Sequence, residues 1–146
     1  MLQSIDLRDY MIHKPVTVTA ETNLMAAMKL ILDHKISGLC VVDADKNLVG
    51  ILSEVDCLRG VLSATYNKDA IGSVGEYMTC DDLDVVGLGW DIVDIATRML
   101  DRNKRRMPVV ENGKLIGQVT IRQILQAVSR FSAKDDHSVR KFSLMR

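Results

Sequence analysis

The chain has 146 residues, with 19 basic and 19 acidic side chains, so its formal net charge is zero. Apolar residues make up 47% and charged residues 26%, as in a soluble globular protein long enough to bury one core. A neutral chain has no overall field that attracts nucleic acid, which argues against general nucleic-acid binding. There is neither a signal-peptide pattern at the start nor an apolar run approaching about 18 residues, so we expect a cytoplasmic protein with no membrane partner.

The cysteines and histidines do not have the spacing of a metal site or of a disulfide framework. The cysteines are odd in number and lack a CxxC pair, and the histidines share no ligand spacing with them or with one another. No nucleophile, acid and base are predicted to converge. We therefore expect no metal, no prosthetic group and no catalytic residues, and hence no enzyme. The six residues are Cys40, Cys57, Cys80, His13, His34 and His137.

The first half of the chain alternates between strand and helix patterns. Residues 4–11 have the spacing of a short helix, which Lys14-Pro15 ends. A β-branched run at 16–19 predicts a strand. After a cap at Thr22 or Asn23, apolar residues recur at helical spacing on a single stripe. The stripe consists of Leu24, Ala27, Met28, Ile31 and Leu32.

Two apolar strands and a second helix complete this half. Residues 39–42 and 48–52 are short apolar runs typical of buried strands, and the polar segment 43–47 between them predicts a turn. A helix is predicted from Glu54 to Ser63, followed by a connector over 64–75.

The same pattern then returns with an offset of 67 or 68 residues, which identifies an internal repeat. Cys40-Val41-Val42-Asp43 recurs as Pro108-Val109-Val110-Glu111, and Leu48-Val49-Gly50 recurs as Leu115-Ile116-Gly117. The intervening Asn-Gly pair at 112–113 is a strong hairpin signal. The helical stripe recurs as Ile92, Ile95, Ala96, Met99 and Leu100.

The repeat predicts an α/β (α+β) fold of two β-α-β-β-α units packed around a pseudo-twofold axis. Each unit is too small to bury its apolar faces alone, so we expect one shared core. We place the first repeat, with its N-terminal helix, at 1–63, the connector at 64–75, the second repeat at 76–129 and a flexible C-terminal tail at 130–146. The basic and aromatic residues of that tail could also bind RNA or an acidic partner.

Ser53 lies where the apolar strand 48–52 meets the second helix. A serine there can cap the helix, with Asp56 reaching back to complete a capping box. The same hydroxyl and carboxylate, one helical turn apart, also suit the hydroxyls of a ribose. These residues alone leave both interpretations open.

In order and spacing, these motifs resemble a tandem CBS domain, or Bateman module, over roughly 9–129. The resemblance implies a sensor that is not an enzyme and that binds adenine nucleotides or related adenosyl ligands in the cleft between the repeats. AMP, ADP, ATP and S-adenosylmethionine are the implied regulatory ligands. It also implies a homodimer and a regulated partner protein, which the sequence does not identify. The alternative is a structural or protein-interaction dimer module whose pocket is empty.

The family's ribose-binding Ser/Thr-x-x-Asp falls on Ser53 and Asp56. The matching positions in the second repeat are Thr120 and Gln123. Glutamine completes a capping box as well as a carboxylate does, but an ionised carboxylate accepts hydroxyl hydrogens more strongly. We therefore expect the pocket with Ser53 and Asp56 to bind ribose better than the one with Thr120.

The resemblance also places the basic run Lys104-Arg105-Arg106 at the cleft, where it implies phosphate binding. Guanidinium groups suit phosphate in geometry and charge. The alternative is a solvated helix end, at which cations favour the C-terminal dipole. Gly38, in the uncharged matching loop of the first repeat, is included among the candidate nucleotide-binding residues.

Overall fold

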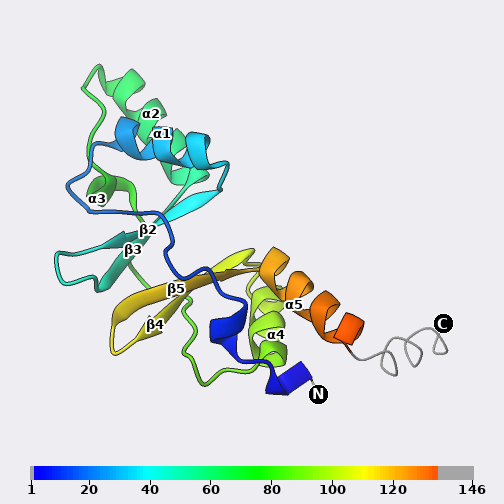
Figure 1. Cartoon of the computed structure of the whole chain (residues 1–146). Helices are drawn as coiled ribbons and strands as arrows, with labels where there is room; N and C mark the ends of the chain where they lie inside the picture. Colours follow the sequence, from blue (N-terminus) through cyan, green and yellow to red (C-terminus); the bar gives the residue numbers. More distant parts are fainter. Residues whose placement is uncertain (1, 135–146) are drawn as a thin grey trace. The chain divides into compact units, whose positions relative to one another are not determined.

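The computed structural model describes residues 2–134, which form two compact units that cut across the repeats. Of the described residues, unit 1 contains 2–13, 85–109 and 117–134, and unit 2 contains 14–84 and 110–116. Figure 1 labels the main elements. In chain order they are the 3-10 turns η1 (Leu2–Ser4) and η2 (Leu7–Asp9), β1 (Thr17–Val18), α1 (Leu24–His34), β2 (Gly38–Val42), β3 (Leu48–Ser53), α2 (Glu54–Asn67), α3 (Val74–Tyr77), α4 (Ile92–Asp101), β4 (Arg106–Glu111), β5 (Lys114–Thr120) and α5 (Ile121–Lys134).

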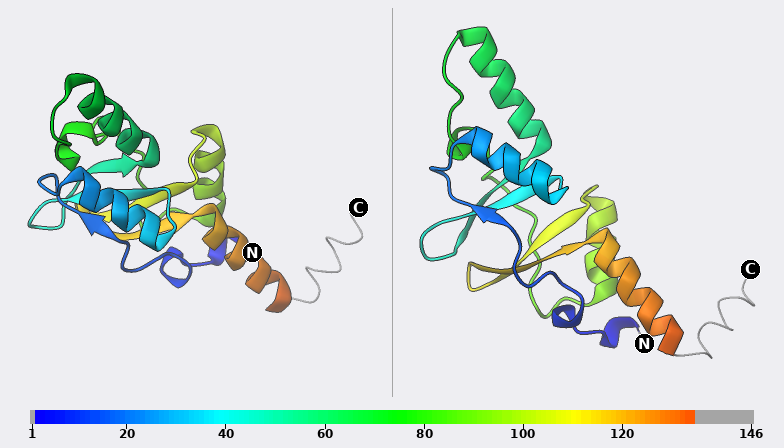
Figure 2. Two further views of the ribbon diagram at one scale, coloured as in Figure 1. Left: turned by 90° about the horizontal axis from the view of Figure 1, so that it is seen from above. Right: turned by 45° about the horizontal axis from the view of Figure 1, so that its top comes forward.

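Unit 2 is built on a three-stranded sheet in the order β1-β2-β3. Strand β1 runs parallel to β2, and β2 pairs antiparallel with β3 in a register that sets Gly38 opposite Ser53. Helices α1 and α2 lie side by side, as both views of Figure 2 show. This arrangement matches the predicted strand, helix, strand, strand and helix. Helix α2 is longer than expected and ends where Lys68 takes a left-handed conformation.

The core of unit 2 lies between this sheet and the helices. Leu24 and Leu52 are fully buried there. Helix α2 comes close to Leu24 because residue 60 is glycine: a Cβ at Gly60 would lie 2.2 Å from Leu24 Cδ2. The predicted apolar stripe is wrong at its last position in both repeats, since Leu32 and Leu100 are 71% and 78% exposed. The buried cluster consists of Val18, Leu24, Ala27, Ile31, Leu39, Val41, Leu52, Cys57 and Val74.

The tip of the β4–β5 hairpin belongs to unit 2. Asn112 and Gly113 both have positive φ, 53° and 82°, as the predicted two-residue hairpin turn requires. The Leu48 N–H donates to Gly113 O at 3.1 Å, and the Lys114 ammonium donates to Asp45 O at 2.7 Å. These two hydrogen bonds therefore hold the hairpin tip against the turn that connects β2 and β3.

Unit 1 contains α4, α5 and most of the β4–β5 hairpin, and it also includes the N-terminal residues 2–13. Ile12 pairs with Gln118 through two backbone hydrogen bonds of 2.7 and 2.9 Å. The short helical segment expected over 4–11 is confirmed only in part, because the chain forms the two 3-10 turns η1 and η2 and not one helix over that range. Leu7 and Tyr10 are both buried, and their spacing of three residues suits a 3-10 turn. Of the predicted tail, residues 135–146 lie outside the described part of the chain.

Candidate functional site

The candidate site lies where β3 ends and α2 begins. Ser53 is in an extended conformation, and its Oγ accepts a hydrogen bond from the Asp56 N–H at 3.1 Å. The Ser53 N–H in turn donates to Asp56 Oδ2 at 2.9 Å. These two bonds form the capping box that the sequence predicts. The cap fixes both side chains at the carboxyl end of a buried strand.

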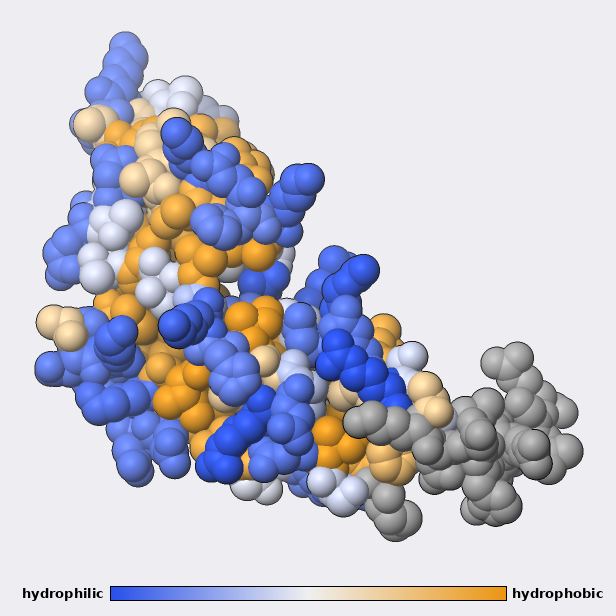
Figure 3. Space-filling model, in the orientation of Figure 1, coloured by the Kyte–Doolittle hydropathy of each residue, from blue (hydrophilic) through white to orange (hydrophobic). Residues whose placement is uncertain are grey.

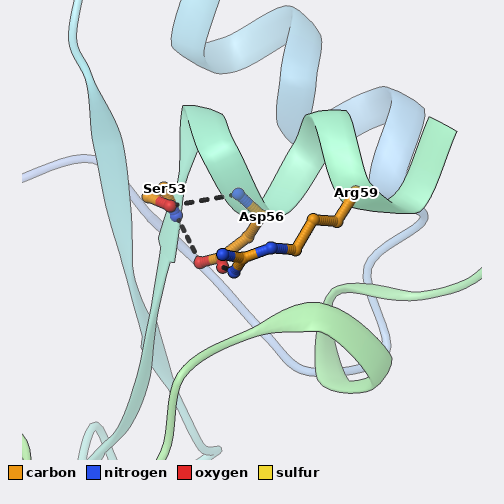
Figure 4. A network of polar contacts seen from close by, with 3 residues as sticks. All are labelled: Ser53, Asp56 and Arg59. Atoms are coloured by element: carbon orange, nitrogen blue, oxygen red, sulfur yellow. Dashed lines mark hydrogen bonds and ion pairs between the residues drawn. The ribbon is translucent and has the colours of Figure 1, made fainter. Parts of the chain in front are cut away.

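Asp56 has a second carboxylate oxygen that the cap does not use. The Arg59 guanidinium donates to this Oδ1 at 3.4 Å, with the Arg59 side chain folded back along α2 (Figure 4). Asp56 is only 5% exposed, whereas the Arg59 side chain is 71% exposed. The site is therefore a buried carboxylate whose second oxygen, Oδ1, is paired with the water-exposed guanidinium of Arg59. The sequence interpretation missed Arg59, although opposite charges three residues apart on a helix would have indicated the pair.

Gly38 lies beside this junction because it pairs with Ser53 across β2 and β3. A Cβ at Gly38 would lie 2.8 Å from the backbone oxygen of Leu52, so glycine allows the two strands to approach. The Glu54 N–H donates to Ser37 O at 3.0 Å, which ties the first turn of α2 to the loop before β2. These contacts give Gly38 a role in positioning Ser53. Its contact with a nucleotide stays a prediction.

The matching junction of the second repeat has the same local design without the carboxylate. The Thr120 N–H donates to Gln123 Oε1 at 3.0 Å, and the Gln123 N–H donates to Thr120 Oγ1 at 3.3 Å. The Thr120 hydroxyl also donates to the Gln123 amide oxygen. A neutral amide thus completes the cap here, which is the difference expected from the sequence.

The predicted phosphate-binding run lies in unit 1, at the start of β4. Lys104 and Arg105 are exposed, and Arg106, the first residue of β4, is half-buried. The Arg105 carbonyl accepts from the Ile121 N–H at 3.1 Å, which mirrors the Ser37 contact of the first repeat. The Ser53–Asp56 pair belongs to unit 2. A shared role of these cations with that pair stays a prediction.

The thiol nearest in sequence to Asp56 is unsuited to nucleophilic chemistry. Burial raises the pKa of Cys57, and the negative charges of Asp56 and Glu54 raise it further. A thiol with a raised pKa is protonated at neutral pH and is a poor nucleophile. Within residues 2–134, no three His, Cys, Asp or Glu side chains are placed to hold a metal ion. No helix in this described range is long and apolar enough to cross a membrane.

A family model of the CBS domain matches the chain twice, at residues 7–63 and 74–130. The chain therefore belongs to the CBS domain family, and its mixed α and β fold consists of two CBS repeats.

Relatives with similar sequences include both small proteins and long enzymes. An uncharacterized 17.7 kDa protein of Acidianus ambivalens is 31% identical over 116 residues, which are 79% of this chain and 68% of that protein. Inosine-5'-monophosphate dehydrogenase of Aquifex aeolicus is 35% identical over 118 residues, which are 80% of this chain. Those residues are only 23% of the dehydrogenase, so the chain spans about a quarter of that enzyme's length.

Similar solved structures include CBS pairs with adenosyl ligands bound. The structure of CBSX2 in complex with AMP has a TM-score of 0.77 and 30% identity, and the match covers 88% of this chain and 99% of that one. CBSX2 is a CBS-pair protein of Arabidopsis thaliana. The CBS domain pair of protein MJ0100, in complex with 5-methylthioadenosine and S-adenosyl-L-methionine, has a TM-score of 0.71 and 25% identity. That match covers 90% of this chain and 98% of the other.

Proposed function

We propose that this protein is a regulatory module that binds an adenosine-containing ligand through Ser53 and Asp56 and passes the binding state to a partner protein. The observation that carries the proposal is the Asp56 carboxylate, which is 5% exposed and has one oxygen left over by its capping box. Similar CBS pairs whose structures contain AMP, or 5-methylthioadenosine and S-adenosylmethionine, support the choice of ligand.

The chemistry of the site fits ribose hydroxyls. An ionised carboxylate only accepts hydrogen bonds, and bonds from hydroxyls to a carboxylate are short and strong. Asp56 stands on the first turn of α2, a helix of 14 residues, and its cap already fixes its rotamer. Ribose therefore meets an acceptor that loses little conformational entropy on binding. In this proposal Gly38 positions Ser53, Thr120 marks the weaker site, and Lys104, Arg105 and Arg106 are additional candidates for phosphate contacts.

A thermal-shift panel on the purified chain tests this proposal. AMP, ADP, ATP and S-adenosylmethionine are each added, and the 2',3'-dideoxy analogues of AMP and ATP serve as matched ligands that keep the phosphates but lack both ribose hydroxyls. A ligand at about 100 times its dissociation constant stabilises the fold by about 2.7 kcal/mol, so a clear rise in melting temperature is expected for at least one of the four. A rise of the same size with the dideoxy analogues would mean that the hydroxyls are not recognised, and the ribose assignment would be wrong.

A second candidate function is a protein-interaction module without a ligand, since the capping role alone accounts for both polar pairs. The exposed apolar surface favours it. Leu58 is 60% exposed and borders a groove of about 180 Å³ between α1 and α2, together with Met28, Leu32 and Val61. Figure 3 shows apolar side chains reaching the surface in the part of the molecule formed by α1 and α2. A partner that covers this groove would bury them.

Under either function we propose a homodimer, because the C-terminal helices of both repeats expose leucines that a twofold contact would bury on both copies. Leu58, Leu62 and Leu125 are 60%, 47% and 63% exposed, and Val128 is half-buried. Light scattering at about 100 µM is expected to give twice the mass of the 16.3 kDa chain. Leu58→Glu should shift the mass towards one chain. A monomer in the unmodified protein at that concentration would contradict the dimer.

The proposal includes no catalytic step. The relatives named inosine-5'-monophosphate dehydrogenase match over about a quarter of their length. The cytoplasmic location and the absence of a membrane partner stay predictions from the sequence. The existence of a regulated partner protein also stays a prediction.

A further inference from the structure

Asp56 and Arg59 occupy one face of α2, and Glu54, Cys57 and Leu58 border the apolar groove on another. At about 100° per residue, Asp56 and Arg59 are separated by roughly 60° around the helix axis, whereas Glu54 is roughly 140° or more from each. Glu54 instead borders the apolar groove with Cys57 and Leu58. On the face that carries the candidate ribose acceptor, Arg59 is thus the cation that pairs with Asp56, and the Glu54 carboxylate lies on a different side of the helix.

The ion pair between Asp56 and Arg59 contributes little to the stability of the fold. Its N–O distance is 3.4 Å, and the guanidinium side is 71% exposed, so water screens the interaction. Ser53 holds Asp56 in place without help from Arg59. Arg59 can therefore leave Asp56 Oδ1 without disturbing the cap.

The second repeat provides an internal comparison for this pair. Its positions matching Asp56 and Arg59 carry Gln123 and Gln126. The second junction therefore keeps the cap but has neither the acid nor the base. Carboxylate and guanidinium occur together in one repeat and are both replaced by amides in the other, so the cap does not require Arg59.

We infer that Arg59 is the specificity-determining residue of the Ser53–Asp56 site, and that it selects phosphorylated adenosine over uncharged or cationic adenosyl compounds. The inference rests on the proposed function. Ribose hydroxyls replace the guanidinium at Asp56 Oδ1, and the released guanidinium then pairs with the 5'-phosphate of the same ligand. Guanidinium matches phosphate in shape and donates two parallel hydrogen bonds to it. A sulfonium or ammonium ligand finds a like charge there instead.

Titration calorimetry with the full chain tests this inference, using AMP, adenosine and S-adenosylmethionine as ligands. Arg59→Gln installs the residue of the second repeat. We expect it to weaken AMP about tenfold to hundredfold, which is the loss of a charge-assisted contact. Adenosine should bind as well as before or more tightly, because its hydroxyls no longer compete with Arg59 for Asp56. Arg59→Lys keeps the charge and should restore part of the AMP affinity.

Arg130→Gln is the matched control, because it removes one exposed positive charge from α5 and should leave every affinity unchanged. Equal weakening of AMP and adenosine by Arg59→Gln would make Arg59 a structural support of Asp56 and overturn the inference. An unchanged ratio of AMP to adenosine affinity would overturn it as well. Binding of none of the three ligands to the unmodified protein would instead overturn the proposed function itself.

Discussion

We expect Leu24→Ala to lower the free energy of unfolding by about 2–5 kcal/mol, the range for removing a large aliphatic side chain from a packed core. Leu24 has no exposed surface. Its Cδ2 lies against Gly60 of α2, so the substitution opens a cavity between α1 and the helix that carries Asp56. Since the backbones are already close, the helices have little freedom to collapse into that space. Urea denaturation followed by circular dichroism measures the loss.

Leu32→Ala is the matched control, because it removes the same atoms from the same helix. Leu32 is 71% exposed, so its substitution should change stability by no more than about 0.5 kcal/mol. Both variants are compared at one protein concentration. Equal losses for the two variants would mean that α1 is not packed as described, and the core of unit 2 would have to be reassigned.

The repeat made most of the fold predictable from the sequence. The two helical stripes and the two pairs of apolar strands recur in the same order, so each repeat supports the assignment of the other. The Asn112-Gly113 turn was predictable because positive φ at both residues strongly favours this dipeptide. Local pattern and global fold agree at these places.

Other features depend on tertiary contacts, which the sequence pattern does not contain. Leu32 and Leu100 fit their helical stripes but are mostly exposed, because no neighbouring element covers the end of either stripe. The N-terminal segment contains helical spacing, yet its pairing of Ile12 with Gln118 joins it to the second repeat. A partner so distant in the sequence leaves no local signal.

The sequence predicted the hydrogen-bond acceptor of the candidate site, Asp56, but not the cation that pairs with it, Arg59. Ser53 and Asp56 follow from a strand that runs directly into a helix. Arg59 becomes important only because the cap occupies Oδ2 of Asp56 and leaves Oδ1 to the guanidinium, a division visible only in the side-chain geometry. Gly38 is explained by the close approach of the Leu52 carbonyl.

Asp56→Asn separates the capping role of this residue from its proposed ligand role. Asparagine keeps the side-chain oxygen that accepts from the Ser53 N–H, so the stability loss should stay within about 1 kcal/mol. The loss of charge removes the strong acceptor for ribose hydroxyls and should weaken AMP by about 1.5–3 kcal/mol, which is tenfold or more. Asp91→Asn is the matched control: Asp91 caps α4 through the Asp94 N–H at 2.8 Å, and we assign it no ligand role.

Calorimetric titration of AMP into the unmodified chain, Asp56→Asn and Asp91→Asn tests the central claim most directly. We predict saturable binding to the unmodified protein and to Asp91→Asn with the same affinity, and binding at least about tenfold weaker to Asp56→Asn. Equal AMP affinity in all three proteins, or no binding to any of them, would contradict the claim that Asp56 holds an adenosine ligand and would leave it the role of a helix cap.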